Sequence, residues 1–191
     1  MEIRSFLAFE LPPEIKSIVS HASQDMSRFP IDVRWVKVNN IHLTMVFMGN
    51  IHPENLKGIG ENVERVCHRY GPFDISLKGA GVFANRRNPR VLWVGLKGAL
   101  ERMSHFKGAL HKHLRPFGVK VEKRSFRPHL TLGRFPKGAR PGPALDELLT
   151  KYEDLGSPVC SLGQLVMFRS DLKPGGAEYT NLKAWPLEGR H

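Results

Sequence analysis

The tripeptide His-Leu-Thr occurs twice in this chain of 191 residues, at 42–44 and at 129–131. One copy lies in each half of the chain, and both copies continue into apolar residues. The pKa of a histidine is ordinarily about 6.5, so at neutral pH one imidazole can accept a proton while another donates one. Such a pair suits a phosphodiester, where an attacking oxygen loses a proton and a leaving oxygen gains one. The repeat therefore indicates His42 and His129 as a pair of acid–base groups.

Both tripeptides lie in stretches typical of β-strands. Successive strand side chains point to opposite faces, so His42 shares a face with Thr44, and His129 shares a face with Thr131. We expect each strand to bury its leucine and to present its His/Thr pair to a common cleft. The alternative is two amphipathic strands with incidental polar residues, and the recurrence of the same pair in the same register disfavours it.

The charge of the chain points to a polyanionic partner. Its formal net charge is +11 and its isoelectric point is about 10.0. A basic excess of this size favours nucleic acid, a phosphorylated ligand or an anionic membrane surface. The alternative is a generally basic proteome.

Other features favour a cytoplasmic protein that does not associate with membranes. The chain has no 18-residue apolar run, and its first residues contain acidic side chains in place of the apolar core of a signal peptide. Cys67 and Cys160 lack C-x-x-C spacing and fit buried thiols in a reducing compartment, although a bridge between them stays open. We also expect a monomer.

The pattern of apolar residues and turn signals predicts an α+β fold. The helices are too few for a doubly wound sheet, so two similar lobes, each with one His/Thr strand, fit better. Helices are expected over residues 12–26, 53–69, 100–114 and 145–152. Strands are expected over 4–11, 33–38, 41–48, 73–83, 90–96, 126–135, 159–169 and 179–187. The segments 33–38 and 41–48 form either a strand pair or one long bent strand.

At this point the chain resembles a known family, the 2H phosphoesterases, whose hallmark is a tandem His-x-Thr-x motif. It is most similar to the bacterial and archaeal RNA 2′,3′-cyclic phosphodiesterases, long called 2′-5′ RNA ligases. The motif is present at 42–45 and at 129–132, and the resemblance extends over nearly the whole chain. Further segments that resemble this branch are FLAFELP, RVLWVGL, RPHLTLGR and FRSDLKPGGAEYTNL.

The resemblance implies a single domain over 1–191, made of two intertwined, pseudo-symmetric lobes. Each lobe would carry an antiparallel sheet and flanking helices, with the active-site cleft between the lobes. It also implies hydrolysis of RNA 2′,3′-cyclic phosphate ends to 2′-phosphomonoesters, with no metal and no cofactor. In this family the first motif histidine is the proton donor and the second the proton acceptor, which assigns those roles to His42 and His129.

Elementary chemistry adds candidate groups around the phosphate. The hydroxyls of Thr44 and Thr131 can donate hydrogen bonds to the non-bridging oxygens. Arg127 precedes His129 by two residues, so strand parity predicts it on the same face as a phosphate or RNA contact, with a solvent-facing arginine as the alternative. Arg134 has the opposite parity and is expected to project elsewhere unless the strand bulges after Gly133.

Three aromatic residues are weighed as substrate contacts. Phe6 and Phe9 could offer rings for stacking on a base, with a place in the core as the alternative. Tyr179 matches a position near the cleft in the resembled family.

The remaining histidines show no ligand spacing. His111 and His113 are two apart on the expected helix over 100–114, so they neither share a face nor form a metal pair. No P-loop pattern is present for activation by ATP. Three alternatives stay open: a phosphodiesterase for small cyclic nucleotides, reversible 2′-5′ joining of RNA, and a basic RNA-binding module without catalysis.

Overall fold

The computed structural model of the chain describes residues 2–122 and 125–190. This part of the chain is an α+β structure, which confirms the predicted class. Its helices are α1 (Pro13–Met26), α2 (Leu56–Cys67), α3 (Leu100–Leu114) and α4 (Pro143–Lys151). Its strands are β1 (Ile3–Glu10), β2 (Arg34–Trp35), β3 (His42–Ile51), β4 (Phe73–Asn85), β5 (Asn88–Gly98), β6 (His129–Arg134), β7 (Cys160–Leu162), β8 (Gln164–Lys173) and β9 (Gly176–Pro186).

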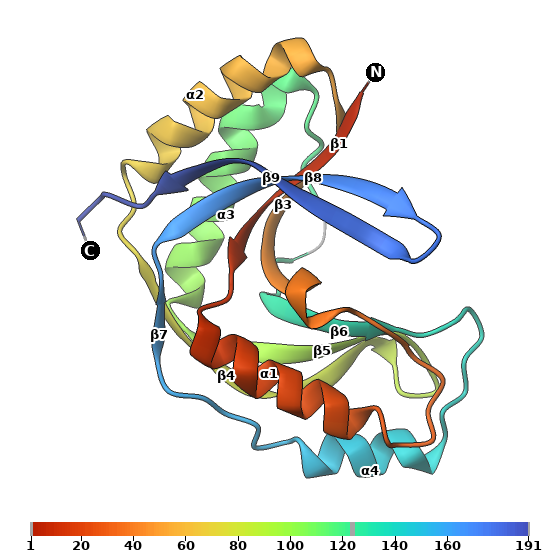
Figure 1. Cartoon of the computed structure of the whole chain (residues 1–191). Helices are drawn as coiled ribbons and strands as arrows, with labels where there is room; N and C mark the ends of the chain where they lie inside the picture. Colours follow the sequence, from red (N-terminus) through yellow and green to blue (C-terminus); the bar gives the residue numbers. More distant parts are fainter. Residues whose placement is uncertain (1, 123–124, 191) are drawn as a thin grey trace.

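The described strands form one curled antiparallel sheet (Figure 1). Its order is β7-β4-β5-β6-β3-β1-β8-β9, with β2 added beside β6. The two motif strands, β3 and β6, are neighbours at the centre, and the register between them places Leu43 opposite Leu130. Each half of the sheet therefore contributes one His-Leu-Thr strand to the middle.

Two pairs of helices flank the two halves of the sheet. Helices α2 and α3 contact each other, and they also contact β9 and β3 respectively. On the other side, α1 and α4 lie near β4 and β5 (Figure 1). The end of α4 is tied to α1 by the Lys151–Asp25 ion pair of 2.5 Å and to β4 by a hydrogen bond from the Ala80 N–H to the Tyr152 carbonyl. The division into two intertwined lobes stays a prediction.

The helices begin and end close to their predicted bounds because their sequence signals are strong. Pro13 opens α1 at a position where no intrahelical N–H is needed. The buried face of α1 carries Ile15, Val19 and Met26 at helical spacing. The buried face of α3 is similar, but it includes one polar side chain, His111, among apolar ones.

The strands differ more from their predicted bounds. Residues 159–169, expected as one strand, contain β7 and the start of β8, separated at Gly163. The strand expected over 126–135 begins only at His129. Both cysteines are free thiols; Cys67 is buried and Cys160 is partly buried. No helix in the described part of the chain is long and apolar enough to cross a membrane.

Truncation of either leucine at the central contact between β3 and β6 should cause a large loss of stability. Leu130 is fully buried and Leu43 is 1% exposed. We expect Leu130→Ala to lower the free energy of unfolding by about 2–5 kcal/mol in urea titrations. Leu43→Ala should be coupled to it by more than about 0.5 kcal/mol in a double-mutant cycle, because the two side chains are cross-strand neighbours. Val159→Ala, at a 70% exposed position, is the control; a loss at Leu130 as small as the control's would contradict this view of the sheet.

Candidate active site

The two motifs meet on one face of the central strand pair. With Leu43 opposite Leu130, the antiparallel register carries His42 toward Thr131 and Thr44 toward His129. All four polar side chains line a single cavity of about 780 Å³. The expected convergence of the two His/Thr pairs is therefore seen in the structure.

Both motif histidines are held in the same way. Nδ1 of His42 lies 2.7 Å from the carbonyl oxygen of Asn40, and Nδ1 of His129 lies 2.7 Å from the carbonyl oxygen of Arg127. A carbonyl can only accept, so Nδ1 carries the proton in each ring. In the neutral imidazole this leaves Nε2 unprotonated and able to act as a base.

The His42 ring is enclosed by aromatic side chains. It stacks on Phe6 with ring centroids 4.7 Å apart, and Phe6 stacks in turn on Phe168 at 5.2 Å. The edge of Tyr179 meets His42 at 5.4 Å. Burial, opposed by the Asn40 carbonyl and reinforced by His129, lowers the pKa of His42 to about 4. His42 is therefore uncharged at neutral pH in the free protein.

The His129 ring has a more open and more cationic environment. Phe83 meets it edge to face at 4.6 Å. Burial is the main cause that lowers the pKa of His129, and the positive charges of Arg134 and Lys107 act in the same direction. The Arg127 carbonyl opposes this shift. Two identical motifs thus hold two imidazoles with different surroundings.

A β-bulge follows the threonine in each motif strand. Along β1, Ala8 faces Thr44 but Leu7 faces Val46, so β3 carries one extra residue. Along β5, Trp93 faces Thr131 but Leu92 faces Gly133, so β6 carries one as well. A one-residue insertion inverts the facing of every later side chain.

The bulges bring Phe47 and Arg134 onto the face of the histidines. Both residues are exposed, and both line the same cavity as His42 and His129. Arg134 was expected to project elsewhere unless the strand bulged, and the bulge reverses that expectation. Gly133 permits the close approach there, because a Cβ atom on it would lie 2.3 Å from Cγ1 of Val33.

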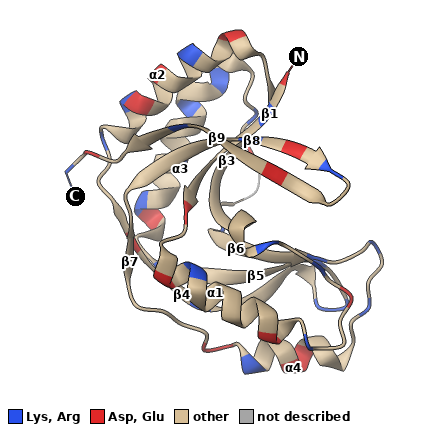
Figure 2. Ribbon diagram, viewed as in Figure 1, with Lys and Arg blue, Asp and Glu red and all other residues tan. Residues whose placement is uncertain are grey.

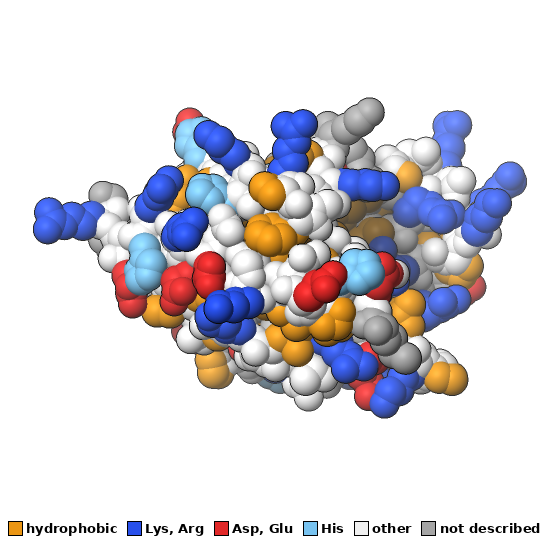
Figure 3. Space-filling model, turned by 90° about the horizontal axis from the view of Figure 1, so that it is seen from above, with side chains coloured by type: hydrophobic (Ala, Val, Ile, Leu, Met, Phe, Trp, Pro, Cys, Tyr) orange, Lys and Arg blue, Asp and Glu red, His pale blue; other side chains and the backbone are white. Residues whose placement is uncertain are grey.

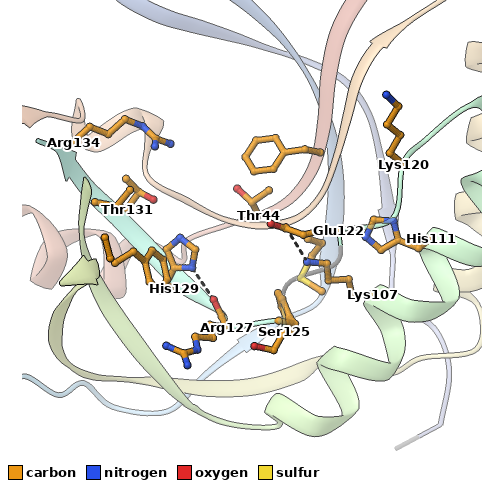
Figure 4. Close-up of a pocket in the computed structure, with 16 residues that line it drawn as sticks. Thr44, Lys107, His111, Lys120, Glu122, Ser125, Arg127, His129, Thr131 and Arg134 are labelled. Carbon is orange, nitrogen blue, oxygen red and sulfur yellow. Dashed lines mark hydrogen bonds and ion pairs between the residues drawn. The ribbon is translucent and has the colours of Figure 1, made fainter. Parts of the chain in front are cut away.

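Arg127 lines a cavity together with His129 and Thr131, and its role as a phosphate or RNA contact stays a prediction. Arg127 lies before β6, so strand alternation does not set its direction. Its carbonyl anchors His129, and its exposed side chain lines this cavity, which adjoins the first (Figure 4). Among the arginines that the structure describes, Arg134 is the one that lines both cavities.

The three aromatic residues weighed as substrate contacts differ in how deeply they are buried. Phe6 is only 3% exposed, and its ring stacks on His42 and on Phe168, which leaves it little face for a base. Phe9 is 1% exposed and belongs to the main core. Tyr179 lies in the cavity wall, as its predicted role requires. Phe47, which the sequence analysis missed, is 60% exposed and presents a ring to the cavity.

The adjoining cavity measures about 560 Å³ and shares Thr44, Phe47, His129, Thr131 and Arg134 with the first. It extends from these residues toward α3 (Figure 4). Residues 2–122 and 125–190 contain no group of three or more His, Cys, Asp or Glu side chains that could hold a metal ion.

Comparison with known proteins places the chain in a family. Residues 12–173 match the sequence profile of the 2′-5′ RNA ligase superfamily. The chain belongs to this superfamily. Among relatives of this superfamily member, an RNA 2′,3′-cyclic phosphodiesterase from Methanothermobacter thermautotrophicus is 32% identical over 187 residues, which cover 98% of this chain and all of the relative. An RNA 2′,3′-cyclic phosphodiesterase from Archaeoglobus fulgidus is 29% identical, covering 96% of this chain and 99% of the relative.

Solved structures are similar to this superfamily member over its whole length. A crystal structure of a protein from Thermus thermophilus has a TM-score of 0.80 and 25% identity, covering 99% of this chain and 100% of that one. The crystal structure of E. coli LigT complexed with NADP+ has a TM-score of 0.72 and 25% identity, covering 98% of this chain and 99% of that one.

The aromatic enclosure predicts how His42 titrates in this superfamily member. Because a lowered pKa means that the neutral ring is favoured, NMR titration should find His42 uncharged from neutral pH down to about pH 5, with a midpoint near pH 4. His129 should titrate below 6.5. Phe6→Ala should admit water and raise the pKa of His42 toward 6.5, whereas the control Phe83→Ala should move His129 and leave His42 unchanged. A His42 midpoint that stays near 4 without the Phe6 ring would exclude this enclosure as its cause.

Proposed function

We propose that this protein hydrolyses RNA 2′,3′-cyclic phosphate ends to 2′-phosphomonoesters by two-histidine acid–base chemistry. The observation that supports this most is the convergence of two imidazoles, each with an unprotonated Nε2, and two threonine hydroxyls in one cavity. The names of the relatives from Methanothermobacter thermautotrophicus and Archaeoglobus fulgidus point to the same reaction.

His129 acts as the base in this proposal. Its lowered pKa keeps it neutral, and its Nε2 can take a proton from a water molecule that attacks the phosphorus. The new P–O bond forms from the water oxygen as the bond from phosphorus to O3′ breaks. General-base assistance of this kind contributes about 10²–10⁴ in rate.

His42 supplies the proton that O3′ needs on leaving. In the free protein its pKa is about 4, so the ring must gain a proton when substrate binds. A cyclic phosphate brings one negative charge beside His42 into a site shielded from water, and an anion there raises the pKa of an imidazole. Substrate binding and protonation of His42 are therefore coupled.

The remaining groups hold the phosphate in place. Thr44 and Thr131 donate hydrogen bonds to the non-bridging oxygens, and the Arg134 guanidinium offsets their charge. Tyr179 has a pKa raised mainly by burial, so its phenol keeps the proton and can also donate.

An RNA chain fits the charge around the site. Lys and Arg residues, blue in Figure 2, lie on the loops at the ends of β4, β5 and β6. Four exposed examples on or next to these loops are Arg34, Arg87, Lys137 and Arg140. On the face seen from above, basic side chains are spread widely, and several acidic ones lie among them (Figure 3). We define the basic rim as Arg34, Arg87, Lys137 and Arg140, and propose that it contacts backbone phosphates.

Turnover of an RNA oligonucleotide with a 2′,3′-cyclic phosphate end tests the proposed function. We expect hydrolysis in excess EDTA, with a 2′-phosphate as the product by phosphorus NMR. His42→Ala and His129→Ala should each lower kcat/KM by at least about 10²-fold with the fold retained, because each removes one proton-transfer group. The matched control is His21→Ala, a histidine on the exposed side of α1.

Three results would contradict the proposal. Near wild-type turnover by either folded histidine variant would remove the acid–base assignment. A 3′-phosphate product would reverse the identity of the leaving oxygen. Loss of turnover in EDTA, restored by one divalent ion, would require a metal-assisted reaction instead.

Salt dependence tests RNA against small cyclic nucleotides as the substrate. Each single-strand phosphate contacted by the basic rim should contribute a slope of about −0.7 in log KM⁻¹ against log salt. An oligonucleotide should therefore show a steeper slope than a nucleoside 2′,3′-cyclic phosphate. Arg87→Glu with Lys137→Glu should flatten the oligonucleotide slope and leave turnover of the nucleoside substrate unchanged. Equal slopes for both substrates would favour a small cyclic nucleotide.

A further inference from the structure

The adjoining cavity carries polar groups that the proposed hydrolysis does not use. It begins at His129 and Thr131 and runs past Thr44 to the face of α3 (Figure 4). At that end four polar side chains, Lys107, His111, Lys120 and Glu122, line the same cavity. We call this end of the cavity the α3 arm.

His111 is the least expected of these side chains. It lies on the buried face of α3, between Leu110 and Leu114, and is only 7% exposed. Neither ring nitrogen has a hydrogen-bond partner within residues 2–122 and 125–190. A buried polar group without a partner costs stability unless something binds it. Because His111 also lines the cavity, a ligand in the α3 arm can provide that partner.

The α3 arm contains charges of both signs, because Lys120 lines it together with Lys107 and Glu122. Nζ of Lys107 lies 3.8 Å from a carboxylate oxygen of Glu122, and the Lys107 side chain is 14% exposed. Burial and the charge of Lys107 lower the pKa of His111, so this ring is neutral. A neutral imidazole has one donor and one acceptor. The arm therefore offers both hydrogen-bond donors and acceptors beside its two lysines.

Apolar and aromatic side chains complete the walls of the arm. Met45, Phe47 and Phe126 line the cavity, and Nζ of Lys107 lies 4.5 Å from the centre of the Phe126 ring. Flat apolar walls suit the face of an aromatic ligand.

We propose that the α3 arm is a nucleobase subsite that reads the terminal nucleotide of the substrate, an inference that rests on the proposed function. A base edge carries both donors and acceptors, which matches Lys107, His111 and Glu122 together. The two lysines of the arm also attract a phosphate, but a phosphate dianion has no proton to donate to the acceptor nitrogen of His111, and the Glu122 carboxylate repels it. The base stacks on the apolar walls while its cyclic phosphate lies at His129 and Thr131.

Comparison of bases with a base-free substrate tests this proposal. The substrates are the 2′,3′-cyclic phosphates of adenosine, guanosine, cytidine and uridine, and 1,4-anhydroribitol 2,3-cyclic phosphate, which has no base. Wild-type protein should distinguish at least two bases by about tenfold or more in kcat/KM. His111→Leu should reduce that difference to about threefold or less, mainly through KM, and should leave the base-free substrate unchanged within about threefold.

Two further variants keep the result interpretable. Glu122→Gln, at a side chain that is 39% exposed, should change the order of preference among bases even if His111→Leu fails to fold. His113→Leu is the matched control, because His113 lies on the same helix but contacts Oδ1 of Asn62 at 3.4 Å and does not line the cavity. It should leave the preference among bases unchanged.

Binding of the four nucleoside 2′-monophosphates separates failure of this inference from failure of the proposed function. If no cyclic phosphate is turned over, but binding depends on the base and loses that dependence in His111→Leu, the subsite stands without the activity. Equal kcat/KM values for all four bases in the wild-type protein would overturn the proposed subsite. The subsite would also be overturned if His111→Leu lowered kcat/KM equally for the base-free substrate. A weaker affinity of His111→Leu for inorganic phosphate would overturn it too, since that result would indicate an anion site.

Discussion

The pairing of β3 with β6 through Leu43 and Leu130 is the constraint on which the site depends. Because the two strands are antiparallel, each motif histidine is carried toward the threonine of the other motif. The four polar groups can alternate around one bound anion only in this arrangement; a parallel pairing would place histidine beside histidine. The buried leucines thus fix both the stability of the sheet and the geometry of the polar face.

The same contact explains what the sequence could predict. The helices and the two motif strands follow from apolar spacing and from turn residues, and the side on which His42 and His129 lie follows from alternation alone. Alternation fails beyond the first β-bulge, because an extra residue has no local sequence signature. Phe47 and Arg134 were missed or misplaced for this reason, and the two errors have one cause repeated in two strands.

Other features of the site depend on packing between distant segments. The burial of Phe6 against His42 requires β1 beside β3 and β8 beside β1, and neither pairing can be predicted from the motif. His111 appeared as a helix residue without a spacing partner. Only the folded chain brings it to a cavity that it shares with residues of β3 and β6. Short-range patterns thus predicted the convergence of the two His/Thr pairs, whereas the groups around them were assembled by tertiary structure.

Each motif histidine donates Nδ1–H to the carbonyl two residues before it, so the motif supplies two chemically equivalent imidazoles. The motif itself therefore does not determine which ring donates a proton and which ring accepts one. In the proposed reaction these roles depend on neighbours outside the repeat: aromatic side chains enclose His42, and the Arg134 guanidinium lies near His129. In a duplicated element of this kind, substitutions in the surrounding strands can exchange the proton-donor and proton-acceptor roles while both histidines stay unchanged. Under the proposed mechanism, the ester bond of the cyclic phosphate that breaks would thus depend on residues outside the two motifs.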